Sequence, residues 1–465
     1  MGHGSSKIPQ PQLPDILIDL STPPDKVYRP GDVVNGNITL APNVPLAPDA
    51  IQVSLFGKSL VWYRTVIVIN NVAHHLHWRD NGPLFEITSN VLPNVHTAAP
   101  LLASGETYKY PFQFRFPASV SNSRSGQYKN DHDARWTIDH HLLPPSFLHT
   151  SKRAVVAGED ANYAKIEYGV RARLKCPGIG FAKGQNIHDL EITAPVLFVP
   201  QNPRANVSQD PPVAIRHSKP FSMRSSALAG QASSSIGFRQ HVRDRLSSST
   251  PKLDFEASLE IPKALASGSE LCLRVFFNVI STTESASHIP TIQFTILKLD
   301  LQELTVVRPP SDKKASDSYG GYHWKNRYEN MPPLDAPFSS REFVSLSKEK
   351  THLNSIPPSA TLNLLETPSE KGKSLQQANS CDTWFKARIP GSTAPSFKSF
   401  AIARTYIIKV KIGIEIGGKK FEYEVKSEVE VGSTPEYYPD AALIELAKGR
   451  KDNTLKKREK RSRWL

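Results

Sequence analysis

The sequence predicts an all-β protein made of two tandem β-sandwich domains with long loops and a basic C-terminal tail. Its 465 residues are enough for two to three domains of about 150 residues each. Long helical periodicities are almost absent, and proline (38 residues) outnumbers glycine (25 residues). Short runs of alternating apolar residues, separated by proline, glycine and asparagine, favour sandwich architecture over helical or α/β architecture.

The first domain is expected over residues 13–200. It opens with the strand-like run Ile16–Leu20, the segment Tyr28–Gly36 (Y-R-P-G-D-V-V-N-G) and a second strand-like run at Asn37–Leu40. The Pro-Gly pair presets a tight turn, because proline fixes φ at the second position and glycine supplies a positive φ at the third. These features predict two neighbouring strands at the start of the domain.

Later runs in this domain alternate with period two, which is typical of strands that lie on a core. They cover residues 51–57, 110–117, 166–174 and 191–199. Three phenylalanines of the second run share one face, and basic residues of the third run lie opposite its apolar face, which predicts a solvated side. The segment Leu143–Phe147 (L-P-P-S-F) precedes the third run.

Residues 201–250 are expected to form a flexible linker, because serine, arginine and proline dominate and apolar periodicity disappears. Three serines near arginines, Ser225, Ser226 and Ser247, are candidate phosphorylation sites. A phosphate would add close to two negative charges and could dock the linker on a basic face or release it.

The second domain is expected over residues 251–435, with an insertion at about 308–380 that is rich in proline, serine, lysine and asparagine. Its strongest signal is Tyr406–Ile416, in which every second residue is apolar. Gly417 and Gly418 then supply a two-residue hairpin turn, and apolar residues return with the same period up to Val431.

The order of these motifs resembles the arrestin family. The first strand, the Y-x-P-G-D turn, the V-x-G element and the second strand resemble the opening of an arrestin N-domain. The L-P-P-S-F segment resembles a feature of fungal arrestin-like sequences, and the hairpin after Ala394–Phe397 resembles the closing strands of an arrestin C-domain. The resemblance covers most of residues 13–200 and 251–432. It implies two immunoglobulin-like sandwiches of the fungal α-arrestin type.

This resemblance implies a cytosolic adaptor in membrane-protein trafficking. Such an adaptor binds cytoplasmic segments of transporters or receptors and promotes their ubiquitination and endocytosis. Fungal α-arrestins usually recruit HECT-type ubiquitin ligases through P-P-x-Y or L-P-x-Y segments, and neither is present here. Pro435–Tyr437 lacks the first proline, and Pro332–Asp335 lacks the tyrosine. The alternative is a signalling or structural scaffold without ubiquitin-ligase coupling, nuclear through its basic tail.

The residues do not predict an enzyme or a cofactor. The chain has no G-x-S-x-G elbow, P-loop or G-x-G-x-x-G motif. His74, His75 and His77, with Asp131–Asp133 and Asp139–His141 further on, come nearest to a zinc set. Polar loop histidines are the favoured interpretation, because no paired metal motif supports them. A metal-dependent enzyme on a β-sandwich is the third alternative.

Cysteine usage and the N-terminus indicate the cytoplasm. Cys176, Cys272 and Cys381 are too few and too scattered for a disulfide framework, and an odd count fits a reducing compartment. The N-terminus lacks the apolar core of a signal peptide, and no apolar run approaches the roughly 20 residues of a membrane span. Gly2 and Ser6 formally fit the myristoylation pattern, but a short Gly/Ser leader is the favoured interpretation.

Residues 436–465 are expected to form a short helix and a basic tail. From Lys448 onward, nine basic residues stand against two acidic ones, a net charge of +7. This charge could draw an anionic membrane surface, with peripheral association at the plasma membrane or endosomes, or it could remain a solvated tail. No base-reading module accompanies it, which argues against nucleic acid. The candidate anion-binding residues are Lys456, Lys457, Arg458, Lys460, Arg461 and Arg463.

The segment before the tail has two interpretations. Leu443, Ile444, Glu445 and Leu446 resemble a clathrin box, but Ala447 stands where the pattern requires an acid. A short helix capped by Asp440 is the favoured interpretation.

Overall fold

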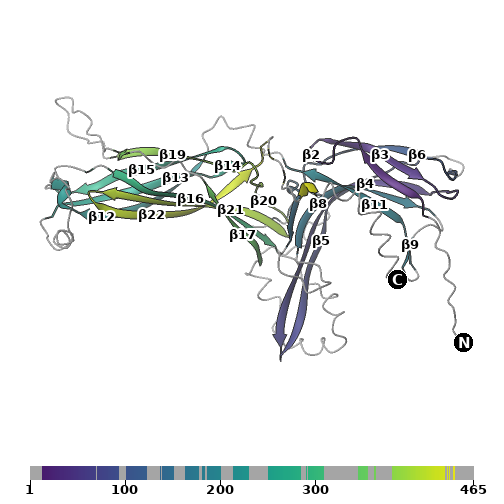
Figure 1. The fold of residues 1–465 in the computed structure, drawn as a ribbon, viewed down its shortest axis with the longest axis horizontal. Helices are drawn as coiled ribbons and strands as arrows, with labels where there is room; N and C mark the ends of the chain where they lie inside the picture. Colours follow the sequence, from purple (N-terminus) through teal and green to yellow (C-terminus); the bar gives the residue numbers. More distant parts are fainter. Residues whose placement is uncertain are drawn as a thin grey trace.

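The structure is a computed structural model that describes residues 13–69, 71–93, 101–122, 137, 139–150, 163–176, 181–183, 186–200, 213–229, 250–283, 290, 292–307, 344–353, 361–362, 380–434, 437, 439 and 443–445. Its strands form two β-sandwiches that follow one another along the long axis of an elongated molecule (Figure 1). The predicted all-β fold with tandem sandwiches is therefore confirmed. No helix among the described residues is long and apolar enough to cross a membrane.

The N-terminal sandwich packs a small sheet against a larger one. The small sheet has the order β1-β3-β6, with β1 (Asp15–Leu20), β3 (Val33–Ala41) and β6 (Tyr108–Arg115). The larger sheet has the order β2-β11-β8-β4-β5, with β7 paired to β8, and contains β2 (Val27–Tyr28), β4 (Ala50–Ile69), β5 (Val72–Asn90), β7 (Phe147–Thr150), β8 (Tyr163–Lys175) and β11 (Leu190–Phe198). A separate hairpin pairs β9 (Phe181–Lys183) with β10 (Asn186–His188).

The C-terminal sandwich has the same plan. One sheet has the order β12-β13-β15-β19, with β12 (Ala214–Arg224), β13 (Lys252–Pro262), β15 (Glu270–Thr282) and β19 (Ser380–Arg388). The other has the order β14-β22-β21-β16-β17, with β18 on β16 and β20 on β21, and contains β14 (Ala264–Ala266), β16 (Ile292–Val307), β17 (Val344–Leu353), β18 (Thr361–Leu362), β20 (Phe397–Lys398), β21 (Ile402–Ile416) and β22 (Lys419–Gly432).

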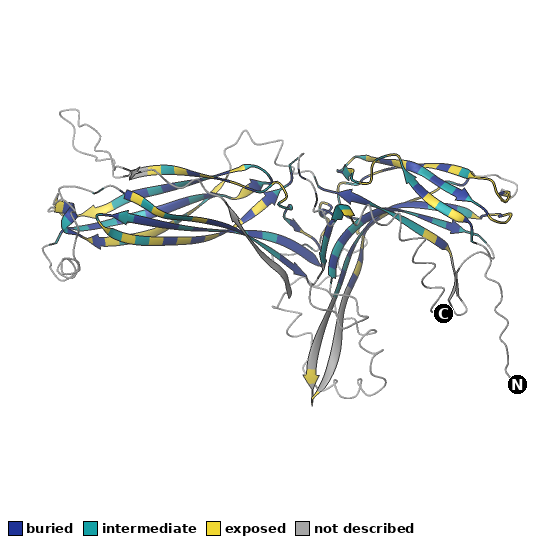
Figure 2. Cartoon of the chain, viewed as in Figure 1, coloured by how far each residue is buried: buried dark blue, intermediate teal, exposed yellow. Residues whose placement is uncertain are grey.

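Alternation along the strands builds both cores, as Figure 2 shows by the change of colour from one residue to the next. Phe112 and Phe114 are each 6% exposed and Phe116 is 2% exposed, so the predicted phenylalanine face is the buried one. In β21, Tyr406, Ile408, Val410, Ile412, Ile414 and Ile416 are likewise buried. Burial of these apolar side chains is the main contribution that holds each pair of sheets together.

The predicted turns are present. Gly31 has a φ of 85°, and the Asp32 N–H donates to the Arg29 carbonyl oxygen at 3.0 Å, which closes the Pro-Gly turn. Gly417 and Gly418 have φ values of 53° and 76°, and β21 and β22 pair directly on either side of them. Both turns need a positive φ, which glycine adopts at little cost.

The structure differs from the sequence-based domain boundaries at two places. Strand β12 lies inside the predicted linker and pairs along its whole length with β13. Strands β17 and β18 lie inside the predicted insertion and pair with β16. In both places polar residues interrupt the apolar alternation, so backbone pairing rather than side-chain pattern defines these edge strands.

We expect Gly36→Ala to destabilise the N-terminal sandwich. A Cβ at Gly36 would lie 2.2 Å from the carbonyl oxygen of Asp19 on β1, so β1 would have to move away from β3. The cost should be about 1–3 kcal/mol in the free energy of unfolding, which denaturant titration measures. Gly391→Ala is the matched control, because nothing lies within 4 Å of its Cβ position. Equal effects of both substitutions would contradict the prediction.

Candidate functional site

A short Pro-Ser-Phe segment closes each sandwich in the same way. In the N-terminal domain, the Ser146 N–H donates to the Phe198 carbonyl at 2.8 Å, and Ser146 Oγ accepts from the Phe198 N–H at 2.9 Å. In the C-terminal domain, Ser396 makes the same two bonds with Val431, also at 2.8 and 2.9 Å. We call each arrangement a serine clasp. Each one satisfies backbone groups at the end of the last strand of its sandwich.

A buried tyrosine completes each clasp. The Tyr168 hydroxyl donates to the Pro144 carbonyl at 2.6 Å, and the Tyr406 hydroxyl donates to the Ala394 carbonyl at 2.7 Å. Each accepting residue directly precedes the Pro-Ser-Phe sequence of its own domain. Burial raises the pKa of both phenols, so they remain protonated donors at any physiological pH.

The two clasps bring their phenylalanines together across the junction of the domains, which we call the joint. The rings of Phe147 and Phe397 lie 5.7 Å apart in an edge-to-face arrangement. The guanidinium of Arg404 lies 4.8 Å from the Phe147 ring centre, and its Nε is 3.1 Å from Glu303 Oε1. The joint is therefore an aromatic contact between domains with a partly buried ion pair behind it.

A histidine of the N-terminal domain also reaches the joint. The His141 ring packs edge-to-face on Phe400 at 4.7 Å, and its Nε2 lies 3.4 Å from Ser399 Oγ. Its Nδ1 lies 2.8 Å from the Asp139 carbonyl, so Nδ1 carries the proton and Nε2 is left as an acceptor. Burial lowers the pKa of His141, and the neutral ring is favoured.

Two further hydrogen bonds cross the joint. Arg29, in the turn near the N-terminus, donates to the Thr434 carbonyl at 3.0 Å. Ser433 Oγ donates to the Pro200 carbonyl at 2.6 Å. The Y-R-P-G turn therefore contributes to the contact between domains as well as to its own sandwich.

A second candidate surface is the far end of the β4–β5 hairpin, which projects away from the body of the molecule (Figure 1). Strands β4 and β5 pair as far as Ile69 and Val72, but β8 pairs with β4 only up to Trp62. Beyond that position neither edge of the hairpin pairs with another described strand. We call this part, residues 63–78, the ribbon. An isolated two-stranded ribbon is marginally stable in water, which suits an element that docks on a partner.

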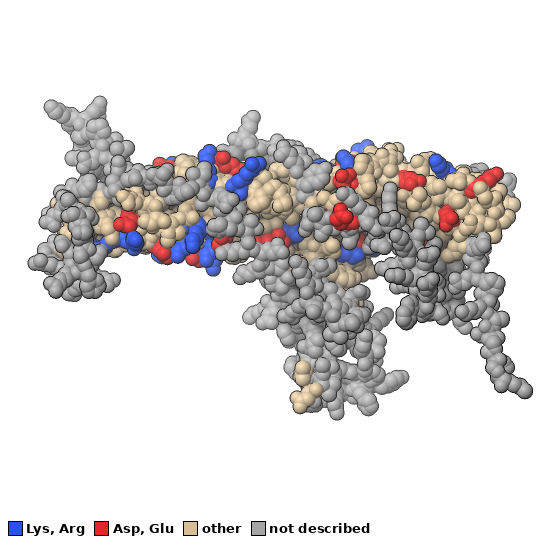
Figure 3. Space-filling model, in the orientation of Figure 1, with Lys and Arg blue, Asp and Glu red and all other residues tan. Residues whose placement is uncertain are grey.

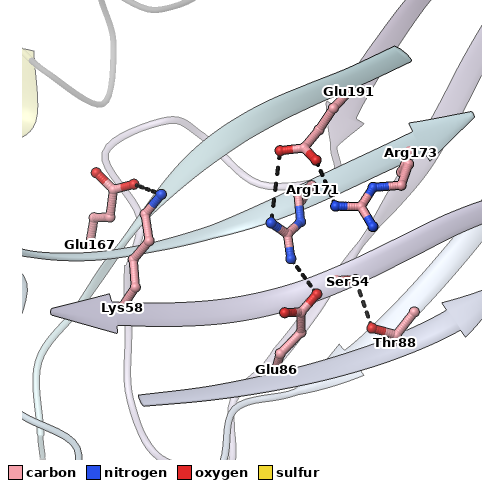
Figure 4. A network of polar contacts seen from close by, with 8 residues as sticks. All are labelled: Ser54, Lys58, Glu86, Thr88, Glu167, Arg171, Arg173 and Glu191. Carbon is pink, nitrogen blue, oxygen red and sulfur yellow. Dashed lines mark hydrogen bonds and ion pairs between the residues drawn. The ribbon is translucent and has the colours of Figure 1, made fainter. Parts of the chain in front are cut away.

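The outer face of the larger N-terminal sheet carries paired charges (Figure 4). Arg171 pairs with Glu86 and Glu191, Arg173 lies 2.9 Å from Glu191, and Lys58 lies 2.8 Å from Glu167. Burial alone would raise the pKa of Glu167, but hydrogen bonds from Lys165 and Lys58 lower it. Basic and acidic side chains are also interspersed over the described part of the face in Figure 3. The predicted solvated side of β8 is confirmed, and its charges largely compensate one another.

Several predicted site residues fall inside the described structure. Ser225 is 1% exposed, and its Oγ accepts from the Ala227 N–H, so its hydroxyl is not accessible to a kinase in this conformation. Ser226 is partly buried in the 3-10 turn η2 (Ser226–Ala229). Residues 443–445 form one helical turn, as expected for a short helix, and the clathrin box stays a prediction.

The remaining predicted site residues either lie outside the described part of the chain or lie on the ribbon. Ser247, Leu446 and the six basic residues of the tail lie outside the described residues, as do Asp131–Asp133. His74, His75 and His77 lie on strand β5, within the ribbon, where they pair with residues of β4, so the expectation that they are loop histidines was wrong. Within the described part of the chain, no group of three or more His, Cys, Asp or Glu side chains is arranged to hold a metal ion.

The sequence interpretation missed the joint. The pattern that could have indicated the joint is the Pro-Ser-Phe sequence, which occurs at 145–147 and again at 395–397, each time before a long strand. Arg404 and His141 gave no local signal, because a single polar residue near a strand start is common.

Truncating the two phenylalanines should reveal their contact across the joint. In a double-mutant cycle of Phe147→Ala and Phe397→Ala, we expect a coupling of about 0.5–1.5 kcal/mol in the free energy of unfolding, since the single substitutions remove the same contact. Phe112→Ala paired with Phe397→Ala is the control, because Phe112 packs in the N-terminal core and should show additivity. Additivity of the first pair would show that the domains are not coupled there.

Acidification should weaken the joint through His141. Because its folded pKa lies below the ordinary value of 6.5, the unfolded state binds more protons, and stability falls as pH drops below that value. We expect His141→Phe, which keeps the aromatic contact, to lose less stability than the wild type between pH 7.5 and pH 5.5. Thermal unfolding of both proteins at the two pH values measures this difference. Identical pH dependence would refute it.

Comparison with known proteins adds one family match. A search of curated proteins finds no match to this chain. Residues 16–187 match the family model described as the arrestin (or S-antigen) N-terminal domain. The match begins in β1 and ends in β10, so it covers the ribbon and Ser146 but not β11, which carries the clasp partner Phe198. Proteins of this kind are generally non-enzymatic adaptors. Residues 16–187 are therefore similar to an arrestin N-terminal domain.

Proposed function

We propose that this protein is a cytosolic adaptor of the fungal α-arrestin type that binds cytoplasmic segments of transporters or receptors and promotes their ubiquitination and endocytosis. The observation that carries the proposal is the ribbon, whose backbone edges beyond Trp62 have no described pairing partner. An extended segment of a membrane protein can add to such an edge through main-chain hydrogen bonds. The repeated clasp supports an arrestin-type C-terminal domain next to the matched N-terminal one.

The outer face of the N-terminal sheet has a lesser role in this proposal. Arg171 and Arg173 are already paired with Glu86 and Glu191, so an acidic or phosphorylated segment would have to displace those carboxylates. An exposed ion pair contributes only about 0–1 kcal/mol. Breaking the existing pairs therefore costs little, and the new pairs with the bound segment would add little to its affinity. Backbone pairing at the ribbon is therefore the main source of affinity that we propose.

Coupling to a ubiquitin ligase needs a contact other than Pro435–Tyr437. Tyr437 is 5% exposed, so its ring is not available to a WW domain in this conformation. We propose that a HECT-type ligase, where it is recruited, uses a degenerate segment elsewhere. The buried tyrosine and the missing P-P-x-Y motif favour a second function, a signalling or structural scaffold without ligase coupling. In that function the basic tail would direct the protein to the nucleus rather than to the plasma membrane or endosomes.

Proximity labelling in the native cell tests the adaptor function. One variant should replace residues 63–78 by Asn-Gly, which joins the paired residues Trp62 and Arg79 through a two-residue hairpin turn. We expect the wild type to label plasma-membrane or endosomal transporters together with a ubiquitin ligase. The shortened variant should keep its melting temperature within a few degrees and lose most cargo labelling. Cargo labelling that survives the deletion would rule out the ribbon as the docking element.

Two controls separate the functions. Replacing only Asn70-Asn71 by Asn-Gly retains the ribbon and should retain cargo labelling. Truncation at Gly449 removes the basic tail, and imaging with and without residues 448–465 shows whether the tail directs the protein to a membrane or to the nucleus. Nuclear or cytosolic scaffold proteins without cargo or ligase in the wild-type labelling would favour the second function.

A further inference from the structure

A cavity of about 560 Å³ lies at the joint and is walled by both domains. Its volume is within the range of pockets that hold small molecules, about 300–1,000 Å³. Most of its walls are apolar, and the buried ones include Leu143 and Pro144 from the N-terminal domain and Leu265, Phe397 and Val431 from the C-terminal domain. A ligand in this cavity would contact both sandwiches at once.

The buried Arg404 also lines this cavity. It is 9% exposed, and its Nε forms an ion pair with Glu303 but no hydrogen bond. Within the described part of the chain, its guanidinium makes no other hydrogen bond or ion pair. Arginine has five N–H donors, and buried donors are normally satisfied. Arg404 therefore has spare donor capacity next to an apolar space.

The other polar groups deep in the cavity are already engaged. The Tyr406 hydroxyl donates to Ala394, Ser396 belongs to its clasp, and His141 is bound to Asp139 and Ser399. Of the Lys, Arg and Glu residues that line the cavity, Arg404 is the buried one, and the partly exposed Thr405 adds a neutral hydroxyl to the wall.

The charged side chains at the mouth of the cavity do not favour a ligand of either charge. Lys263 and Lys398 line it together with Glu428 and Glu430, and all four occupy solvent-exposed positions. Because solvent screens these side chains, the buried arginine decides which charge the cavity prefers.

We propose that this cavity binds a single-chain fatty carboxylate, with the acyl chain between the domains and the carboxylate on Arg404. The planar guanidinium matches a carboxylate, which can accept two parallel N–H bonds. The apolar walls remove the acyl chain from water. Because both domains contact the ligand, its binding favours the arrangement of the sandwiches that forms the cavity. This inference does not depend on the adaptor function.

Calorimetric titration of the purified full chain tests the ligand class. The probes are dodecanoate, dodecanol and dodecylammonium, which share a chain length and differ in charge, each used below its aggregation concentration. We expect one dodecanoate per chain, at least tenfold weaker binding of dodecanol, and no saturable binding of dodecylammonium. Equal affinities for the three probes, or no binding of dodecanoate, would overturn the proposal.

Two variants locate the site. Replacing the pair together, by Glu303→Gln with Arg404→Gln, leaves no unpaired buried charge and should weaken dodecanoate at least tenfold without changing dodecanol binding. Ala264→Trp fills the cavity from an exposed position on β14 and should abolish binding of both probes. Ala214→Trp, at an exposed position on β12, is its control. Wild-type affinity for dodecanoate in the correctly folded Ala264→Trp or paired Gln variant would refute the assignment.

Discussion

The serine clasps determine how the two sandwiches meet. The N–H groups of Phe198 and Val431 donate to Ser146 Oγ and Ser396 Oγ. If the serine hydroxyls were removed and these N–H groups stayed buried, each lost hydrogen bond would cost about 1–3 kcal/mol of stability. Each clasp also fixes the direction of the next residue, which is the phenylalanine that crosses the joint. The contact between domains is therefore a consequence of how each domain closes its own sheet, and the chain uses the same solution twice.

The joint and the ribbon are connected through the register of one sheet. Phe147 of the joint pairs with Ile166 on β8, and Ile166 pairs with Ser59 on β4. Three positions further along β4, Trp62 packs edge-to-face on Tyr163 at 6.0 Å, at the last pair between β4 and β8 before the ribbon. Two cross-strand pairs, Phe147 with Ile166 and Ile166 with Ser59, thus connect the aromatic contact between domains to strand β4, which continues into the ribbon. A partner that tilts the ribbon acts on the sheet that carries the N-terminal clasp.

Local chemistry explains which parts of this structure could be predicted. The Pro30-Gly31 turn, the diglycine hairpin and the phenylalanine face depend on residues close in sequence, so their patterns were sufficient. Strand β12 was missed because His217 and Lys219 occupy the alternating positions between Ile215 and Met223, which interrupts the apolar period. Ser225 looked like a linker hydroxyl, but its burial follows from β12. Pairing of the two Pro-Ser-Phe segments is a tertiary contact that no local pattern encodes.

The placement of charge divides recognition between two regions. On the outer face of the N-terminal sheet, arginine and lysine side chains face carboxylates and water, where one charge exchanges for another with little change in free energy. At the joint, Arg404 is shielded from water, where the same charge interacts more strongly and its buried Nε has no hydrogen bond. Discrimination between anions and neutral molecules is therefore stronger at the joint than on the open sheet. The ribbon, with its unpaired backbone edges, is better suited to extended segments than to any particular charge.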